Sequence, residues 1–256
     1  MLQPFGEAEA DRLIRLYAQA EKELGHEIEQ ALLRHDPAED IQALKNLRTR
    51  AAAIRVDLLV GGRTWCTDVL PPLWAEGGRT IGPIMSPEWK QINQRAFKVL
   101  ADNSYSRLQD IDQLIGRRVD DLYRSLALES ARGQLAGYRS WDAMAEVYHA
   151  RLAEHGVTGF VDSLGREWSI SRYAEMVART TAREALLQGS INRMIEYNYD
   201  LVRISTVGGD RVCEKCRRWE GSVLSLTGKT KGYPTLADAR ASGLLHPNCR
   251  HNIYMA

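Results

Sequence analysis

The sequence is poor in cysteine and phenylalanine, and neither sign of charge dominates it. Four cysteines and three phenylalanines occur in 256 residues. The 34 lysine and arginine residues are nearly balanced by 33 aspartate and glutamate residues. The formal net charge of +1 gives no reason to expect binding to a polyanion through net charge alone. No apolar run approaches the roughly 18 residues that would indicate a membrane span.

The first residues also lack the pattern of a secretion signal. No basic segment followed by an apolar run occurs there, so we expect a protein that is made in a reducing cytoplasm. Cys66, alone in the N-terminal half, is then expected to be a small buried hydrophobic residue. The length allows one large domain or two modest ones.

The other three cysteines gather near the carboxyl end. Cys213 and Cys216 form a Cys-x-x-Cys pair, and His246 and Cys249 form a second close pair after an interval of 29 residues. Two such pairs of soft ligands are typical of a structural zinc site. Four protein ligands would close the coordination tetrahedron and leave no position for a substrate water. The pattern therefore predicts zinc bound by Cys213, Cys216, His246 and Cys249.

Other interpretations of these residues stay open. His251 lies two residues after Cys249 and is an alternative fourth ligand to His246. The Cys-x-x-Cys pair could instead be redox-active, although no βαβ pattern surrounds it. The thiols could also carry no metal, whereas a disulfide framework would need a secreted setting.

The N-terminal part reads as long amphipathic helices. Apolar residues recur at three- and four-residue steps over residues 7–35 and again from Pro37 to about Leu58, which predicts an antiparallel helical hairpin. Gly61 and Gly62 are expected to break or kink the second helix, and the glycine content of residues 76–85 predicts a loop. A further helix is expected from Pro87, with Ser86 as its cap, to about residue 131, and a shorter one over residues 140–154.

After residue 156 the pattern changes to a mixture of short strands and helices. A hairpin is predicted over residues 157–168, a helix over 170–197, strands over 201–206, 221–226 and 252–254, and a short helix over 235–240. The expected fold is mainly α: a long helical hairpin or bundle over residues 1–155, followed by a small α+β domain over residues 156–256 that the metal site would staple.

Several short motifs of this second part follow one another as in a known family. They are residues 156–162 (GVTGFVD), 165–168 (GREW), 173–176 (YAEM), 178–181 (ARTT), 201–205 (LVRIS), 219–221 (WEG), 225–228 (SLTG) and 243–251 (GLLHPNCRH). Looser matches lie at residues 101–103 and 120–124. In this order and spacing the chain resembles the phage minor capsid protein 2 family, within the phage head-morphogenesis proteins.

The resemblance implies a structural role rather than an active site. Such proteins are built into the phage head in few copies near the portal vertex, and they are associated with head assembly and with DNA packaging or exit. It therefore implies that the protein is not an enzyme, that it resides in the virion, and that its partners are the portal protein, the major capsid protein or both. The helices would serve protein contact.

DNA contact and nuclease activity are the alternatives. From residue 201 onward, the sequence contains nine basic and four acidic residues. Arg217 and Arg218 could contact the phosphates of DNA. His246, Asn248 and His251 are similar to the residues of a histidine-asparagine-histidine nuclease, although their spacing is tight for that motif. A faint likeness of residues 203–206 to an ADP-ribosyl transferase strand is not followed by a Glu-x-Glu element.

Overall fold

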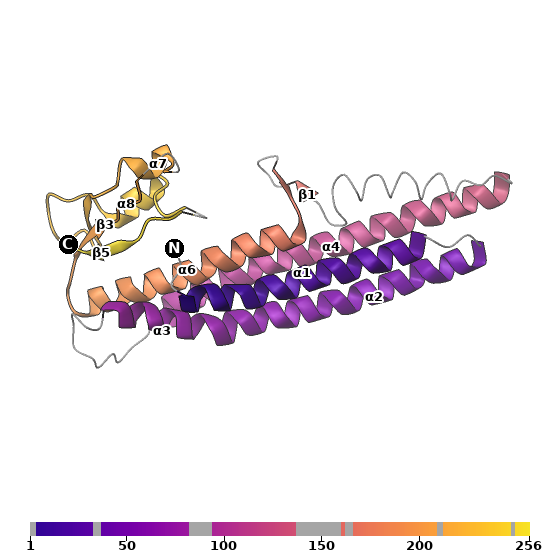
Figure 1. Ribbon diagram of the computed structural model, residues 1–256, viewed down its shortest axis with the longest axis horizontal. Coiled ribbons are helices and arrows are strands. Elements are labelled where there is room, and N and C mark those ends of the chain that lie inside the picture. The colour runs from indigo at the N-terminus through magenta and orange to yellow at the C-terminus, as the bar shows by residue number, and fades with distance from the viewer. Residues whose placement is uncertain are drawn as a thin grey trace. The chain divides into compact units, whose positions relative to one another are not determined.

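The computed structural model describes residues 4–32, 37–81, 94–136, 160–161, 166–208, 212–246 and 249–256. Its long helices are α1 (Pro4–Leu32), α2 (Pro37–Thr64), α3 (Leu70–Ile81), α4 (Gln94–Ala136) and α6 (Ile170–Glu196), and a π-helical turn, η1 (Trp65–Val69), separates α2 from α3 (Figure 1). Its short elements are α7 (Glu214–Arg217), α8 (Leu236–Ala241), β1 (Phe160–Val161), β2 (Glu167–Trp168), β3 (Leu201–Ile204), β4 (Val223–Ser225) and β5 (Ile253–Met255). The prediction of a mainly α chain with a small α+β region near its carboxyl end is confirmed.

The chain divides into two compact units, and each is assembled from separate stretches. The cysteine-rich unit contains Met1–Ala10, Thr67–Asp102 and Ala178–Ala256. The bundle unit contains Asp11–Cys66 and Asn103–Val177. The expected domain boundary after residue 155 lies outside the described residues and stays a prediction.

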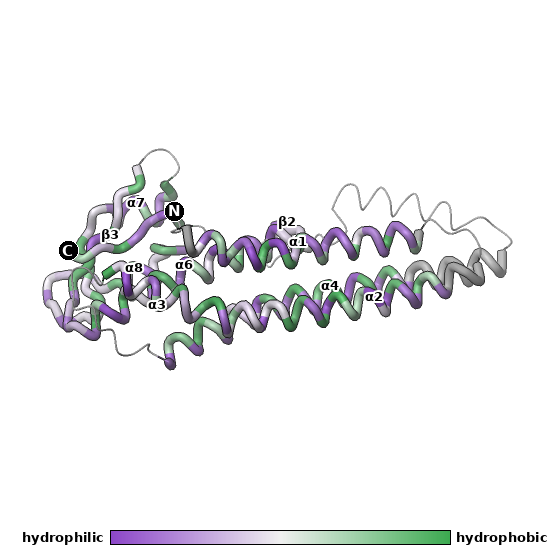
Figure 2. Tube along the Cα trace, turned by 60° about the horizontal axis from the view of Figure 1, so that its bottom comes forward, coloured by the Kyte–Doolittle hydropathy of each residue, from purple (hydrophilic) through white to green (hydrophobic). Residues whose placement is uncertain are grey.

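The bundle unit packs the apolar stripes of its helices against one another. Hydrophobic and hydrophilic turns alternate along these helices (Figure 2). The helices beginning near residue 7 and at Pro37 are confirmed. The fully buried side chains include Leu13, Tyr17, Leu24, Leu44, Leu47, Leu58, Leu108 and Ile111. Cys66 is only 2% exposed, as expected of a small buried hydrophobic residue.

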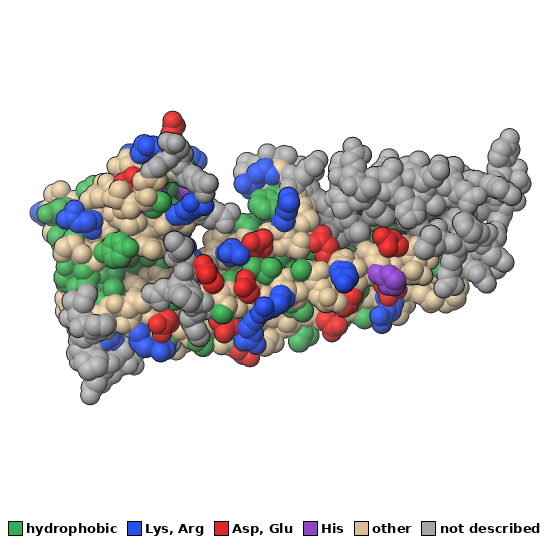
Figure 3. Space-filling view, in the orientation of Figure 1, with side chains coloured by type: hydrophobic (Ala, Val, Ile, Leu, Met, Phe, Trp, Pro, Cys, Tyr) green, Lys and Arg blue, Asp and Glu red, His purple; other side chains and the backbone are tan. Residues whose placement is uncertain are grey.

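Polar contacts tie the helices of this unit together. Arg50 pairs with Glu27 at 3.1 Å between α2 and α1, and Arg48 pairs with Asp120 at 3.1 Å between α2 and α4. Acidic and basic side chains are interspersed on the visible surface (Figure 3). Mixed charge of this kind is typical of a solvated helical face.

One ion pair of the bundle unit lies deeper. The guanidinium of Arg55 donates two hydrogen bonds to the carboxylate of Asp112, at 2.8 and 2.9 Å. The Asp112 side chain is 8% exposed and the Arg55 side chain is 34% exposed. The bidentate geometry fixes α2 against α4 at one position along the bundle.

The expected helix break at Gly61 and Gly62 does not occur, and the loop predicted over residues 76–85 was wrong for residues 76–81, while residues 82–85 lie outside the described residues. The helix runs through Gly61 and Gly62 to Thr64, and residues 76–81 belong to α3. A Cβ atom on Gly77 would lie 1.9 Å from the carbonyl oxygen of Leu186 on α6, and one on Gly189 would lie 1.9 Å from that of Trp74. The backbones of α3 and α6 therefore touch where side chains would hold them apart.

α4 runs without interruption through Asn103 and Gly116. Ile195, near the end of α6, is 43% exposed. The expected helix start at Ser86 and Pro87 and the helix over residues 140–154 lie outside the described residues.

The strands form two small antiparallel sheets. β1 pairs with β2, as the hairpin prediction required. In the cysteine-rich unit the order is β4-β3-β5, so that Val202 lies opposite Leu224 on one side and Met255 on the other. The hydrophobic core of this unit, to which all three strands contribute, includes Leu187, Ile191, Met194, Val202, Ile204, Cys216, Leu224, Leu236, Leu244, Cys249 and Ile253. Among the described residues, no helix has both the length and the apolarity needed to cross a membrane.

Candidate metal centre

The first cysteine pair is placed by the short helix α7. Cys213 is the residue before its first turn and has an extended backbone, with φ −69° and ψ 150°. Its carbonyl oxygen accepts hydrogen bonds from the N–H groups of Cys216 at 3.1 Å and Arg217 at 3.0 Å. This single turn brings the two sulfur atoms to the same side of the chain, as a metal-binding knuckle requires.

The second pair follows helix α8. Thr235 caps α8 by accepting a hydrogen bond from the N–H of Asp238 at 3.0 Å. After the helix, Gly243 has φ 101° and Leu245 has φ 60°, which turns the chain back toward α7. The carbonyl of His246 then accepts from the N–H of Cys249 at 2.9 Å, which ties the two residues of the second pair to each other.

The four predicted ligands and His251 come together in the structure. Their ligand atoms form two groups, Cys213 with Cys216 and His246, and Cys216 with Cys249 and His251, and the atoms within each group lie within 4.8 Å of one another. Cys216 belongs to both groups. The Cys213 Sγ–His246 Nε2 distance is 3.1 Å, and Cys216 Sγ–Cys249 Sγ is 3.7 Å.

The Cys216–Cys249 distance fits an edge of a zinc coordination tetrahedron, whereas the Cys213–His246 distance is shorter than such an edge. Zn–S bonds near 2.3 Å and Zn–N bonds near 2.0 Å place neighbouring ligand atoms roughly 3.5–3.8 Å apart. A cavity of about 220 Å³ is lined by all five candidate ligands. Thiolate sulfur with imidazole nitrogen is also the donor set that zinc prefers. The donor types therefore suit the metal that the spacing predicted, and the ligand atoms of the described residues lie in two groups of three rather than in one group of four.

The five candidates differ in burial. Cys216, Cys249 and His251 are 1%, 7% and 3% exposed, whereas Cys213 is exposed. His246 is half-buried. The centre therefore has a buried side, formed by residues of the hydrophobic core, and an open side at the first knuckle.

Without a metal, the thiols have unequal acidities. Burial raises the pKa of Cys216 to about 12, and the neighbouring Cys213 and Cys249 add to the effect. Burial also opposes the Cys213 thiolate, but hydrogen bonds from Cys216 and His246 outweigh it and lower the pKa of Cys213 to about 7. A bound cation would favour the thiolate at every cysteine, so metal binding should release protons.

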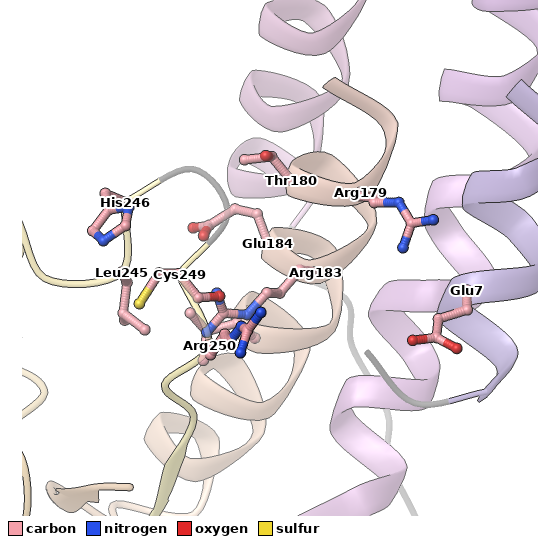
Figure 4. Close-up of a pocket in the computed structure, with 10 residues that line it drawn as sticks. Glu7, Arg179, Thr180, Arg183, Glu184, Leu245, His246, Cys249 and Arg250 are labelled. Atoms are coloured by element: carbon pink, nitrogen blue, oxygen red, sulfur yellow. The ribbon is translucent and has the colours of Figure 1, made fainter. Parts of the chain in front are cut away.

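Helix α6 supports the second knuckle from outside. Figure 4 shows Arg183 reaching from α6 toward Cys249, where a guanidinium N–H donates to the Cys249 carbonyl oxygen. The neighbouring Glu184 accepts two hydrogen bonds from Arg240 of α8, at 2.8 and 3.0 Å. Both ends of the segment that carries His246 and Cys249 are thus tied to one helix.

The sequence did not reveal two carboxylates that organise this region. Glu220 lies 2.9 Å from His251 Nε2 although 31 residues separate them, and Asp200 holds the turn after β4. Glu220 belongs to the 219–221 motif, but nothing local to that motif indicates its distant partner. Only the paired folding of the two segments brings the groups together.

The alternatives based on DNA find less support in this geometry. Arg217 donates to the carbonyl of Val212 at 3.3 Å, and Arg218 donates to that of Ser242 at 3.1 Å and lies over the Trp219 ring. These guanidinium groups therefore already make structural contacts. His251 is buried between Cys249 and Glu220, which is a poor position for a general base that must reach a phosphate. Asn248 lies outside the described residues.

Comparison with known proteins identifies the family. The family model of phage minor capsid protein 2 matches residues 91–255. No curated protein and no solved structure matches the sequence. The matched region covers well over half of the chain and includes α4, α6, the three-stranded sheet and all five candidate ligands. The chain therefore belongs to the phage minor capsid protein 2 family.

Proposed function

We propose that this phage minor capsid protein is a structural part of the virion, present in few copies near the portal vertex, where it aids head assembly and DNA packaging or exit. The family match over residues 91–255 carries the proposal. The long helices of the bundle unit offer extended surfaces for contact with the portal protein, the major capsid protein or both. The basic carboxyl-terminal region would supply a further contact, with DNA.

The second part of the proposal is that one zinc ion staples the cysteine-rich unit. Cys213, Cys216 and Cys249 would supply three thiolates, and His246 or His251 would supply the imidazole. Four protein ligands leave the metal with no position for a substrate, so its contribution would be folding energy rather than chemistry. Cys216 and Cys249 belong to the core of this unit, which supports a structural role for the ion.

Quantitative analysis of purified particles tests the assembly role. Mass spectrometry of full heads should find this protein at a copy number far below that of the major capsid protein, and chemical crosslinking should join it to the portal. Particles assembled without its gene should show defects in head formation or DNA content. Abundance equal to that of the major capsid protein, or absence from particles, would contradict the proposal.

A direct assay separates this role from the nuclease alternative. Purified protein is incubated with plasmid DNA and magnesium or manganese, and the His251→Ala variant serves as the comparison. A structural protein should leave the plasmid intact. Cleavage that disappears in the His251→Ala variant would favour the nuclease, since a general base would then have been removed.

A further inference from the structure

The carboxylate of Glu220 lies at the junction of three segments. It accepts hydrogen bonds from the N–H groups of Val207 at 2.8 Å and Gly208 at 3.4 Å, and its Oε1 lies 2.9 Å from Nε2 of His251. The Glu220 and His251 side chains are 16% and 3% exposed. The carboxylate is therefore held by the backbone after β3 and directed at one imidazole nitrogen.

This contact determines which nitrogen of His251 can bind a metal. A carboxylate accepts hydrogen bonds, so Nε2 carries the proton and Nδ1 keeps its lone pair in the neutral imidazole. Nδ1 lies 3.4 Å from the sulfur of Cys249 and belongs to the group that Cys249 and Cys216 complete. The lone pair is thus on the side of the buried thiols.

Metal-binding histidines usually donate their other N–H to a carboxylate or a carbonyl, which fixes the ring and raises its basicity. His251 has this arrangement in full, with Glu220 as the acceptor. His246 enters the cluster from the other side, with Nε2 at 3.1 Å from Cys213, and it is only half-buried.

We infer that His251, bound through Nδ1 and positioned by Glu220, is the fourth zinc ligand, together with Cys213, Cys216 and Cys249. His246 then lies beside the centre rather than in it. This inference rests on the proposed zinc site and replaces the ligand set predicted from the sequence with a more specific one. Glu220 does not touch the metal and acts through the imidazole.

The arrangement links the metal to the sheet. His251 precedes β5, while Val207 and Gly208 follow β3. The same two segments exchange hydrogen bonds between Ser205 N–H and Asn252 carbonyl, and between Asn252 N–H and Ser205 Oγ, both at 2.8 Å. Through Glu220, the ion would fix the ends of two paired strands as well as the two knuckles.

Zinc content and zinc affinity test the inference in the full chain. Wild-type protein should contain one zinc per chain by elemental analysis, and its absence would refute the proposed site as a whole. Competition with a chelator should show a 10- to 100-fold weaker affinity for Glu220→Ala. Glu220→Gln should lose less, because its amide oxygen still accepts from Nε2. The exposed Glu214 of α7 provides the matched control Glu214→Ala, which should bind as the wild type does.

The two histidines are compared in the same assay. His251→Ala should lose at least as much affinity as Glu220→Ala, whereas His246→Ala should stay within a few-fold of the wild type. Loss of zinc from His246→Ala with retention by His251→Ala would overturn the assignment. Unchanged affinity in Glu220→Ala, with only a lower melting temperature, would show that Glu220 merely holds the loop.

Two further measurements test the inference if His251→Ala fails to fold: a variant with a different metal ligand at position 251, and the tautomer of the His251 ring. In the His251→Cys variant a thiolate replaces the imidazole, so adding Glu220→Ala should cause no further loss of zinc affinity. In nitrogen-15 spectra of the wild type, His251 should show a metal-bound Nδ1 and a protonated Nε2. A protonated Nδ1, or a full additional loss in the double variant, would contradict the inference.

Discussion

Asp200 shows how much local order a single carboxylate can impose. It lies just before β3 and accepts side-chain hydrogen bonds from Ser225 at 2.7 Å, Thr227 at 2.6 Å and Thr230 at 2.6 Å. It also accepts from the N–H groups of Thr227 and Thr230. Burial opposes its charge, but these donors together outweigh burial and hold the pKa of Asp200 far below its usual range.

Replacing Asp200 by asparagine should therefore destabilise the cysteine-rich unit by about 1.5–3 kcal/mol at pH 7. Because the folded-state pKa is lowered, the stabilisation is present above the unfolded-state value near 4 and is lost as the pH falls below it. Urea unfolding at several pH values should thus show the gap between wild type and variant closing below about pH 4.

The control for this experiment is Glu196→Gln at the exposed end of α6. It removes a carboxylate of the same unit that makes no comparable contacts, and its effect should stay within about 0.5 kcal/mol at all pH values. A gap for Asp200→Asn that is constant with pH would show that geometry, rather than ionisation, stabilises the turn.

At the scale of elements, α3 and α6 approach each other closely in the cysteine-rich unit. The side chain of Ser190 donates to the Gly77 carbonyl at 2.7 Å, and Thr80 donates to the same oxygen at 2.7 Å. Where α3 and α6 cross, they contact each other through glycine residues and hydroxyl hydrogen bonds rather than through large apolar side chains. The arrangement leaves no space for a methyl group on either backbone.

Gly77→Ala should push the helices apart and cost about 1–3 kcal/mol or more, because the obstructing atoms belong to the Leu186 backbone. Gly61→Ala in α2 is the matched control, since its new methyl group would meet only the flexible end of Leu16. Alanine favours a helix over glycine by up to about 1 kcal/mol, so this variant should be neutral or slightly more stable. Thermal unfolding of both variants checks the contrast; equal effects would refute it.

In the bundle unit, the Arg55–Asp112 ion pair is expected to contribute to stability. Asp112→Ala should cost about 1–3 kcal/mol, less than for a fully buried pair, because a third of the Arg55 side chain remains in water. The double variant Arg55→Met, Asp112→Leu should recover much of the loss, since no unpaired charge remains. Denaturant unfolding of the two single variants and the double variant measures the coupling free energy between the two side chains. Losses of stability that simply add in the double variant would contradict the prediction.

The helices were predictable from the sequence because the apolar stripe has a helical period, and Leu13, Leu24 and Leu47 are buried as that period requires. Gly61 and Gly77 misled the prediction because helix propensity carries no information about neighbouring helices. The spacing of Cys213, Cys216 and Cys249 identified the candidate centre. The partner of His251 was not predictable, because it depends on a contact over 31 residues.

At the scale of the molecule, the proposed zinc ion should stabilise one unit and spare the other. A strong chelator, or the variant Cys216→Ser, should unfold the cysteine-rich unit while the helices of the bundle unit persist. Hydrogen exchange would then increase in β3, β4 and β5 but not in the described parts of α2. Cys66→Ala is the control, because it removes a cysteine of the bundle unit and should leave the zinc content unchanged. Unaltered exchange in the strands after metal removal would contradict the stapling role.

The discontinuous make-up of the cysteine-rich unit has a consequence for biosynthesis. Its first two stretches, Met1–Ala10 and Thr67–Asp102, leave the ribosome well before Ala178–Ala256 exists. The glycine face of α3 therefore cannot pack until α6 has been synthesised, and Cys213, Cys216 and Cys249 are made after both helices. Completion of this unit is thus a late event, and a chain that is terminated before Ala178 would expose unfinished surface to chaperones and proteases.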